Sequence, residues 1–352
     1  MKILHTSHHG LPDHRVERAA YIAKKNGHTI EYLGLGETNA PTLDVFDNIT
    51  MLRRLNNLQV ALSRSIRKEW IKEIERINPD IIHANDLVAA RFSSMSDYPM
   101  VYDDHEYWSK QRVSYRTWPL WRQFVILPYT IGIPRWEKNI LSKHVTITVS
   151  EGIAEEHRRI APRVFVLQNY CLREEVKDIP RNANRSGIAY VGSDLTTKGI
   201  VTVGPNHPVA KIHKPVPHRD MTGITDFIEF DAIHGLPRKE LYQALSEYQF
   251  GLIPFKDNPF AKYSNSAKTF DYLNCGLQVL MTRSIYEAHG GLPYTYPIDD
   301  YTDIQTLVDQ HKNVGPLEIM DYAHENLVWE AQQERLFEAY NLCLELFNKS
   351  SS

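Results

Sequence analysis

The stretch SNSAKTFDYLNCGLQVL, residues 264–280, combines small hydroxyl side chains, an amine and a carboxylate. The pattern predicts a helix over 267–274, with Ser266 and Lys268 in or beside its first turn, where free backbone N–H groups favour an anion. A lysine there opposes the helix dipole unless it meets a negative partner. Asp271, one turn further on, can accept both hydroxyls of a ribose. Helix capping explains the serines but not Lys268, so the stretch indicates a nucleoside-diphosphate site.

A second candidate for the same ligand is the loop GSDLTTKG, which follows an expected strand at 188–191. Gly192 and Ser193 would let backbone N–H groups approach a diphosphate, and Lys198 would add a positive charge. The loop does not have the GxxxxGK[ST] pattern of a P-loop. Because a loop lysine is usually just solvated, the loop alone is weak evidence.

Near the start of the chain, a polar loop joins a short apolar run to a helix that begins close to Asp13. Gly10 in this loop would let the backbone approach a ligand closely. The GxGxxG fingerprint of dinucleotide-binding folds is absent. Arg15 and Glu17 are typical of a solvated first turn, and the sequence favours that interpretation.

His105 ends another expected strand and lies between Asp104 and Glu106. A neighbouring carboxylate can keep an imidazole protonated, so that it donates to an anion or a sugar hydroxyl. A structural histidine in a network at the end of the strand explains the same residues equally well. Asp86, which also follows a strand, is best interpreted as a helix cap.

The overall composition limits the classes of function. The chain has 352 residues, which favours two domains. Its formal net charge of −3 predicts no nucleic-acid partner. Three widely separated cysteines suit a reducing compartment. No stretch reaches about 18 consecutive apolar residues, so the sequence predicts no membrane-spanning helix. We therefore expect a cytoplasmic protein, either free or peripheral at the inner face of the membrane.

Apolar strand patterns alternate with helical patterns in both halves of the chain, and the strands end in polar residues. This is typical of parallel α/β sheets whose ligands bind at the carboxyl ends of the strands. The predicted fold class is α/β, with two Rossmann-like doubly wound domains facing each other across a cleft. We expect an N-terminal domain over residues 1–168, a linker over 169–186 and a C-terminal domain over 187–328. A final helix is expected over 329–352.

An aromatic and basic segment lies between Tyr107 and Glu137. It holds four of the six tryptophans, five cationic residues and no acidic residue. Such a composition suits an anionic membrane surface, to which each cation contributes roughly 1 kcal/mol. It also suits a sugar-stacking surface or a partly buried helix with tryptophans in the core. The candidate acceptor or membrane residues are Trp108, Arg112, Arg116, Trp118, Trp121 and Arg122.

The order and spacing of these motifs resemble the GT-B glycosyltransferases, specifically the retaining family 4 group, over nearly the whole chain. The resemblance is carried by PDHRVERAAYIAKKNGH, PDIIHAND, YDDHE, ITVSEGIAEE, VGSDLTTKG, NSAKTFDYLNCGLQVL and Trp329-Glu330. It implies an acceptor-binding N-terminal domain, a nucleotide-sugar-binding C-terminal domain and a final helix that returns to the first. It assigns Lys198 to the diphosphate, Asp271 to the ribose and His105 to the donor sugar. It also implies that no metal or other cofactor is needed.

Three positions depart from the family pattern. Tyr263 stands where the first glutamate of Glu-x7-Glu is common, Asp271 replaces the second, and Ser193 stands where an arginine is frequent. The predicted function is a retaining transfer of a sugar from a nucleoside diphosphate to a hydroxyl of a glycan or lipid-linked acceptor. The alternatives are a catalytically inactive homologue that binds sugar nucleotides and a sugar-nucleotide epimerase on the same fold.

Overall fold

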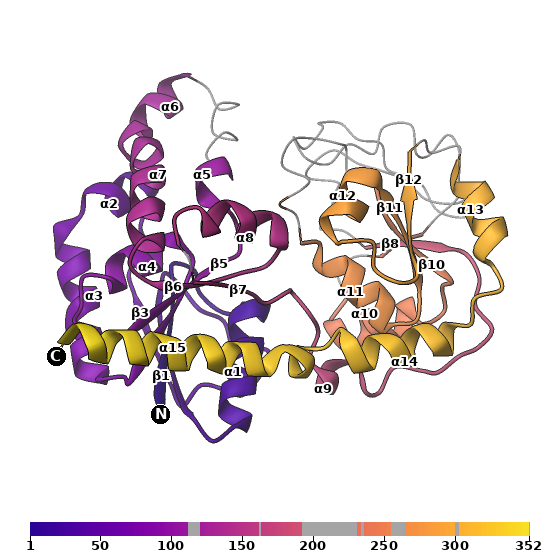
Figure 1. Cartoon of the computed structure of the whole chain (residues 1–352), viewed down its shortest axis with the longest axis horizontal. Coiled ribbons are helices and arrows are strands. Elements are labelled where there is room, and N and C mark those ends of the chain that lie inside the picture. The colour runs from indigo at the N-terminus through magenta and orange to yellow at the C-terminus, as the bar shows by residue number, and fades with distance from the viewer. Residues whose placement is uncertain are drawn as a thin grey trace. The chain divides into compact units, whose positions relative to one another are not determined.

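The computed structural model describes residues 1–111, 120–161, 163–191, 231–233, 236–254, 263, 265–299 and 303–351. The chain divides into two compact units. Unit 1 comprises Met1–Gln168 and Gln332–Ser352, and unit 2 comprises Asn169–Ala331. Both units are α/β, with helices around a parallel sheet (Figure 1).

The sheet of unit 1 has the strand order β3-β2-β1-β4-β5-β6-β7, and every neighbouring pair is parallel. The chain starts in the middle of this sheet and builds outward in both directions, which is the doubly wound arrangement. The strands are β1 (Lys2–Ser7), β2 (Thr29–Leu35), β3 (Asn48–Leu52), β4 (Ile81–Asn85), β5 (Met100–Asp104), β6 (Val145–Thr148) and β7 (Val164–Val166).

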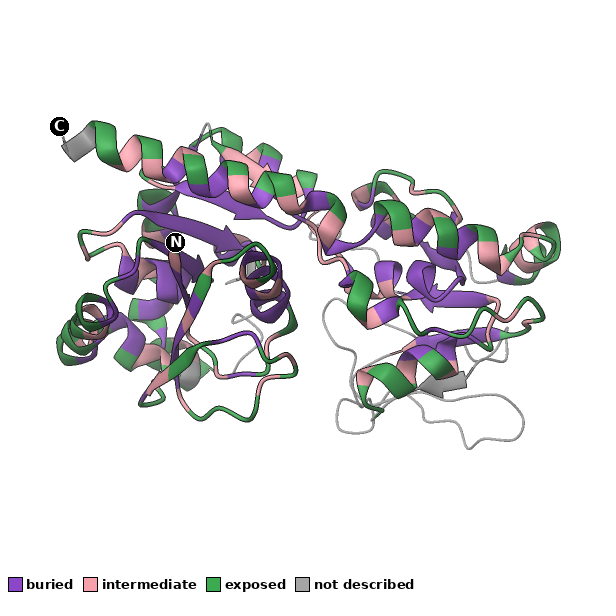
Figure 2. Ribbon diagram, turned by 90° about the horizontal axis from the view of Figure 1, so that it is seen from below, coloured by how far each residue is buried: buried purple, intermediate pink, exposed green. Residues whose placement is uncertain are grey.

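Helices cover the sheet of unit 1 and bury their apolar sides against it. Figure 2 shows the strands largely buried and the helices exposed on their outer sides. The helices are α1 (His14–Lys25), α2 (Asn57–Leu62), α3 (Arg64–Ile77), α4 (Leu87–Ser93), α5 (Trp108–Gln111), α6 (Leu120–Val125), α7 (Leu127–Leu141), α8 (Glu151–Arg158) and α15 (Gln333–Ser351).

Both ends of α1 follow from the local sequence. The Asp13 side chain accepts hydrogen bonds from the backbone N–H groups of Arg15 and Val16, which caps the first turn. At the other end Gly27 takes a positive φ of 82°, which glycine adopts at little cost. The yellow helix α15 in Figure 1 packs against β5, β6 and β7. The final helix thus belongs to unit 1.

Unit 2 is built on a parallel sheet with the order β12-β11-β10-β8-β9 among its described strands. These are β8 (Ile188–Val191), β9 (Asp231–Ile233), β10 (Phe250–Ile253), β11 (Gln278–Thr282) and β12 (Thr295–Ile298). Its helices are α9 (Arg173–Val176), α10 (Arg238–Leu245), α11 (Ala267–Asn274), α12 (Arg283–Ala288), α13 (Asp303–His311) and α14 (Pro316–Asn326), followed by the 3-10 turn η5 (Trp329–Gln332).

Helix α11 lies very close to β10. A β-carbon added at Gly251 would lie 2.3 Å from the Tyr272 ring, so only glycine fits below this tyrosine. The Tyr272 hydroxyl accepts a hydrogen bond of 2.8 Å from the backbone N–H of Val191. These two contacts fix α11, which carries Ser266 at its N-terminal end, against the sheet.

The segment 169–186, which the sequence indicates as a linker, contributes to the core of unit 2. Cys171, Val176 and Ile179 are buried in the main apolar cluster of this unit. The apolar runs at 200–203 and 227–230, which also predict strands, lie outside the described residues. None of the helices within the described ranges is long and apolar enough to span a membrane.

Candidate functional site

Polar side chains gather where three central strands of unit 1 end. Ser7 ends β1, Asn85 ends β4, and Asp103 and Asp104 end β5. Because neighbouring parallel strands run in one direction, their carboxyl ends meet at the same edge of the sheet. This edge carries His105 and the first loop of the chain.

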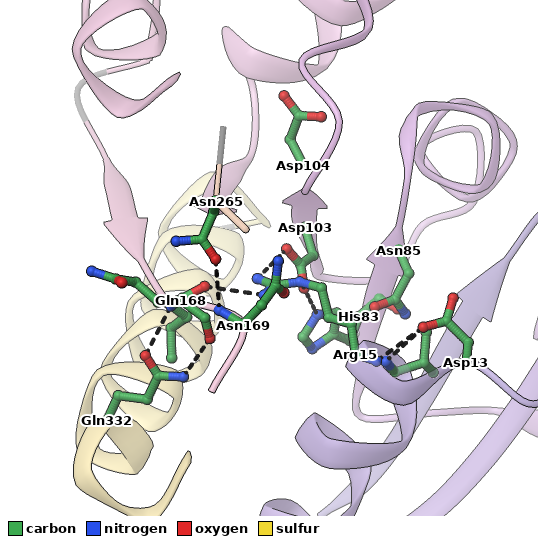
Figure 3. Close-up of polar contacts among 12 residues, drawn as sticks. Asp13, Arg15, His83, Asn85, Asp103, Asp104, Gln168, Asn169, Asn265 and Gln332 are labelled. Carbon is green, nitrogen blue, oxygen red and sulfur yellow. Dashed lines mark hydrogen bonds and ion pairs between the residues drawn. The ribbon is translucent and has the colours of Figure 1, made fainter. Parts of the chain in front are cut away.

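A buried ion pair lies at the centre of this edge (Figure 3). Arg15 donates two hydrogen bonds to Asp103, Nε to Oδ2 at 2.9 Å and Nη2 to Oδ1 at 2.8 Å. His83 Nε2 lies 3.2 Å from the same carboxylate, and His83 Nδ1 lies 2.7 Å from the hydroxyl of Tyr340 on α15. Burial alone would raise the pKa of Asp103, but the charge of Arg15 and the hydrogen bond with His83 hold it below its usual value.

The interpretation of Arg15 and Glu17 as a solvated first turn is wrong. Both side chains are buried. Glu17 accepts hydrogen bonds from the backbone N–H groups of Asp13 at 2.9 Å and Leu43 at 2.8 Å. The first turn of α1 therefore faces inward and connects two loops and the end of β5. The sequence shows that Arg15 and Glu17 are charged, but it does not show that their partners come from distant parts of the chain.

A close backbone contact within unit 1 explains why residue 10 is a glycine. A β-carbon at this position would lie 1.9 Å from the backbone carbonyl oxygen of Glu37, so the loop after β1 runs directly against the loop after β2. The close approach is to the protein's own backbone. A donor contact at Gly10 stays a prediction.

His105 is partly exposed at the end of β5. It lies near His9, whose pKa is lowered by burial first, then by the charge of His8, with a smaller contribution from His105. Asp86 is confirmed as a helix cap, because its Oδ1 accepts from the backbone N–H groups of Val88 at 2.8 Å and Ala89 at 3.0 Å.

Trp108 does not belong to an exposed surface, and its assignment as an acceptor or membrane residue is wrong. It is only 8% exposed and belongs to the core cluster of unit 1, because α5 packs against α7. Trp121 on α6 is 69% exposed. Arg122 lies on the same helix. The other candidates, Arg112, Arg116 and Trp118, lie outside the described residues.

In unit 2, Ser266 occupies the N-cap position of α11, but its side chain makes no capping hydrogen bond. Lys268 lies in the first turn and is partly buried. Gly192, Ser193 and Lys198 lie outside the described residues. The part of the predicted diphosphate site that the structure describes is therefore the start of α11.

Asp271 has close partners within unit 2. Its Oδ1 accepts a hydrogen bond from the Tyr242 hydroxyl at 2.7 Å, and it lies 3.3 Å from Nη1 of Arg238 and 3.2 Å from Sγ of Cys171. Arg238 also reaches Glu175, with a distance of 3.6 Å between Nε and Oε1. Arg238 and Tyr242 are site residues that were not predicted from the sequence, and their spacing of one helical turn is the signal that could have indicated them.

His289, at the C-terminal end of α12, was also missed. Its ring is buried and stacks on Phe270 of α11, with 5.5 Å between the ring centres. Burial lowers the pKa of His289 to about 4, and the nearby backbone of Ser266 opposes this only partly. His289 is therefore neutral at physiological pH and lies beside the start of α11.

No protein-family model and no curated protein sequence matches this chain. Solved structures do resemble it over nearly its whole length. Sucrose-phosphate synthase from Thermosynechococcus elongatus has a TM-score of 0.60 at 12% identity, covering 99% of this chain and 98% of the other. The glycosyltransferase WaaG, involved in lipopolysaccharide biosynthesis, has a TM-score of 0.55 at 11% identity and coverages of 98% and 99%.

The UDP-GlcNAc 2-epimerase from Neisseria meningitidis, solved with UDP-GlcNAc, is similar to the same degree. Its TM-score is 0.53 at 11% identity, with coverages of 97% and 99%. At such identities the likeness concerns the fold alone. The predicted fold class is confirmed: the chain has the two parallel α/β sheets of the GT-B fold. Membership of the retaining family 4 stays a prediction.

Proposed function

We propose that this protein transfers a sugar from a nucleoside diphosphate to an acceptor hydroxyl, with retention at the anomeric carbon. The observation that carries the proposal is the start of α11, where Ser266 and Lys268 open a helix and the Ser266 side chain makes no capping hydrogen bond. The fold supports it, because the similar structures include a glycosyltransferase and an enzyme solved with UDP-GlcNAc.

The proposed chemistry requires stabilisation of a leaving diphosphate. The bond between the anomeric carbon and the phosphate oxygen breaks, and the diphosphate leaves with the electron pair. A new bond forms to the acceptor oxygen, whose proton is released. Lys268, Lys198 and the N–H groups at the start of α11 would hold the developing negative charge. The resemblance assigns His105 to the sugar ring and Asp271 to the ribose.

The nucleotide is identified by thermal shift with UDP, GDP, ADP and CMP. A ligand at 100 times its dissociation constant should stabilise the folded protein by about 2.7 kcal/mol. Stabilisation by a diphosphate nucleotide is the expected result. If none of the four nucleotides raises the melting temperature, the proposed donor site is wrong.

Replacing Lys268 by alanine is expected to weaken binding of the stabilising nucleotide at least tenfold, because the variant loses a cation at a helix N-terminus. Lys239→Ala is the matched control, since Lys239 lies exposed near the start of α10. Titration calorimetry gives both affinities. Equal affinities in the Lys268 variant and the wild type would exclude α11 as the diphosphate site.

Incubation with nucleotide sugars separates the alternatives. A transferase releases the nucleoside diphosphate when an acceptor is present, whereas an epimerase changes the sugar without any acceptor. Nucleotide binding without either reaction would indicate an inactive homologue, the alternative raised by Ser193, Tyr263 and Asp271. Nuclear magnetic resonance of the sugar anomeric protons follows all three outcomes.

We further propose that unit 1 meets its glycan or lipid-linked acceptor at an anionic membrane surface, in the cytoplasm. Exposed apolar side chains cluster on α6 and the start of α7, within the segment of five cations and no acidic residue. No nucleic-acid partner is expected. The exposed apolar residues are Leu120, Trp121, Phe124, Val125, Leu127 and Ile131.

Co-sedimentation with vesicles containing phosphatidylglycerol tests this surface. The double variant Trp121→Ser/Phe124→Ser should lose most of its binding, because both side chains are about 70% exposed and apolar. Met95→Ser, an exposed apolar residue just after α4, is the control. Equal sedimentation of wild type and double variant would contradict the proposal.

A further inference from the structure

Three buried side chains of unit 1 converge from different elements: Asp104 at the end of β5, Glu137 on α7 and His157 on α8. One ligand atom from each lies within 4.8 Å of the other two. His157 Nε2 lies 2.5 Å from Asp104 Oδ2. Two carboxylates and one imidazole are common ligands of divalent first-row metals. None of the three belongs to the proposed nucleotide site.

The hydrogen bonds within the cluster leave part of it without partners. Ser109 donates to Glu137 from its backbone N–H, at 3.2 Å, and from its hydroxyl. The second oxygen of Asp104, Oδ1, is buried and has no hydrogen-bond partner. Figure 3 shows the Asp104 carboxylate directed away from the network around Asp103. A buried carboxylate oxygen without a partner is costly, and a cation would satisfy it.

A second buried oxygen lies close by. The Tyr102 hydroxyl makes no hydrogen bond of normal geometry, although the side chain is completely buried. Tyr102 precedes Asp104 by two residues on β5, so the two side chains lie on the same face of the strand. This part of unit 1 therefore holds two buried oxygen atoms, Asp104 Oδ1 and the Tyr102 hydroxyl, that have no hydrogen-bond partner.

We propose that Asp104, Glu137 and His157 bind one divalent transition-metal cation of the Zn²⁺ type. The site is structural, because all three ligands are buried and structural sites of this kind are closed to substrate. It is independent of the proposed transfer reaction, for which the resemblance implies no metal.

The position of the cluster indicates what the cation would stabilise. Asp104 directly precedes His105, and Ser109, four residues after His105, is held by Glu137. Between them, Tyr107 has a positive φ of 44° and places its ring edge-on to His157, with 5.1 Å between the ring centres. A cation at the cluster would hold both ends of the loop that carries His105. The metal ligands are thus positioning residues for this loop.

The experiment uses the full chain, stripped with a chelator and then exposed to one equivalent of ZnCl₂. After gel filtration, elemental analysis should find about one zinc per wild-type chain, and the melting temperature should rise above that of the stripped protein. Glu137→Gln, which keeps the side-chain shape, should bind zinc more than about tenfold more weakly. Glu151→Gln, an exposed carboxylate on α8, is the control and should bind as wild type does.

Competition with a coloured zinc chelator gives the affinities, and circular dichroism verifies that each variant is folded. Asp104→Asn provides the same test if the Glu137 variant does not fold. Two results overturn the proposal: stripped wild type that gains neither zinc nor thermal stability, or zinc that binds with equal affinity to the folded Glu137 or Asp104 variant. In either case the cluster is a hydrogen-bonded triad only.

Discussion

Replacing Arg15 by methionine is expected to lower the free energy of unfolding of unit 1 by about 3–5 kcal/mol. The guanidinium group supplies both hydrogen bonds of the bidentate contact with Asp103 and a third, of 3.0 Å, to the backbone carbonyl of Leu167. Methionine fills a similar volume but leaves the Asp103 carboxylate charged and buried beside His83. Denaturation in urea measures the loss, and hydrogen exchange in β5 assigns it to unit 1.

Two variants make this prediction specific. Arg76→Met removes the arginine of the surface pair with Glu73, and it should cost at most about 1 kcal/mol. Arg15→Met/Asp103→Leu removes both buried charges and should recover part of the loss. If the single Arg15 variant were as stable as the Arg76 variant, the buried pair would not be a main stabilising contact of this sheet edge.

The fold could be predicted from the sequence because its signals are local. Apolar runs such as residues 145–149, helical spacing from Val16 to Ala23 and Gly27 at the helix end all reflect neighbours in the chain. Polar residues after each strand correctly indicated a parallel sheet, and ligand binding at the carboxyl ends of its strands stays a prediction. The short strands β3, β7 and β12, of three to five residues, were not predicted, since so few residues carry too little periodicity.

The candidate site was less predictable, because its contacts join residues far apart in the sequence. Arg15 meets Asp103 across 88 residues, and His83 meets Tyr340 across 257. From the local sequence alone, these residues indicate only a charged first turn of a helix and a polar strand end. Trp108 shows the opposite error, since a tryptophan among cations suggests a surface although its helix packs into the core. Only the tertiary packing decides which of two side chains with similar neighbours becomes buried.

Replacing Asp271 by alanine is expected to lower the free energy of unfolding of unit 2 by about 2–3 kcal/mol in the absence of any nucleotide. The Asp271 carboxylate accepts from Tyr242 and Arg238, and its side chain is only 15% exposed. A hydrogen bond that involves a charged group contributes about 1.5–3 kcal/mol. Urea denaturation of the nucleotide-free variant measures this structural contribution.

The same variant separates the structural role of Asp271 from the ribose contact that the resemblance implies. Asp271→Asn keeps an oxygen acceptor for Tyr242 and should recover part of the stability, while Asp309→Ala, an exposed carboxylate on α13, should be nearly neutral. A carboxylate that served only the ribose would leave the nucleotide-free protein unchanged and reduce nucleotide affinity alone. A folded alanine variant with unchanged affinity would exclude the ribose contact. Loss of both quantities would mean that a carboxylate held by Arg238 and Tyr242 also binds the ligand, with its position fixed before the nucleotide arrives.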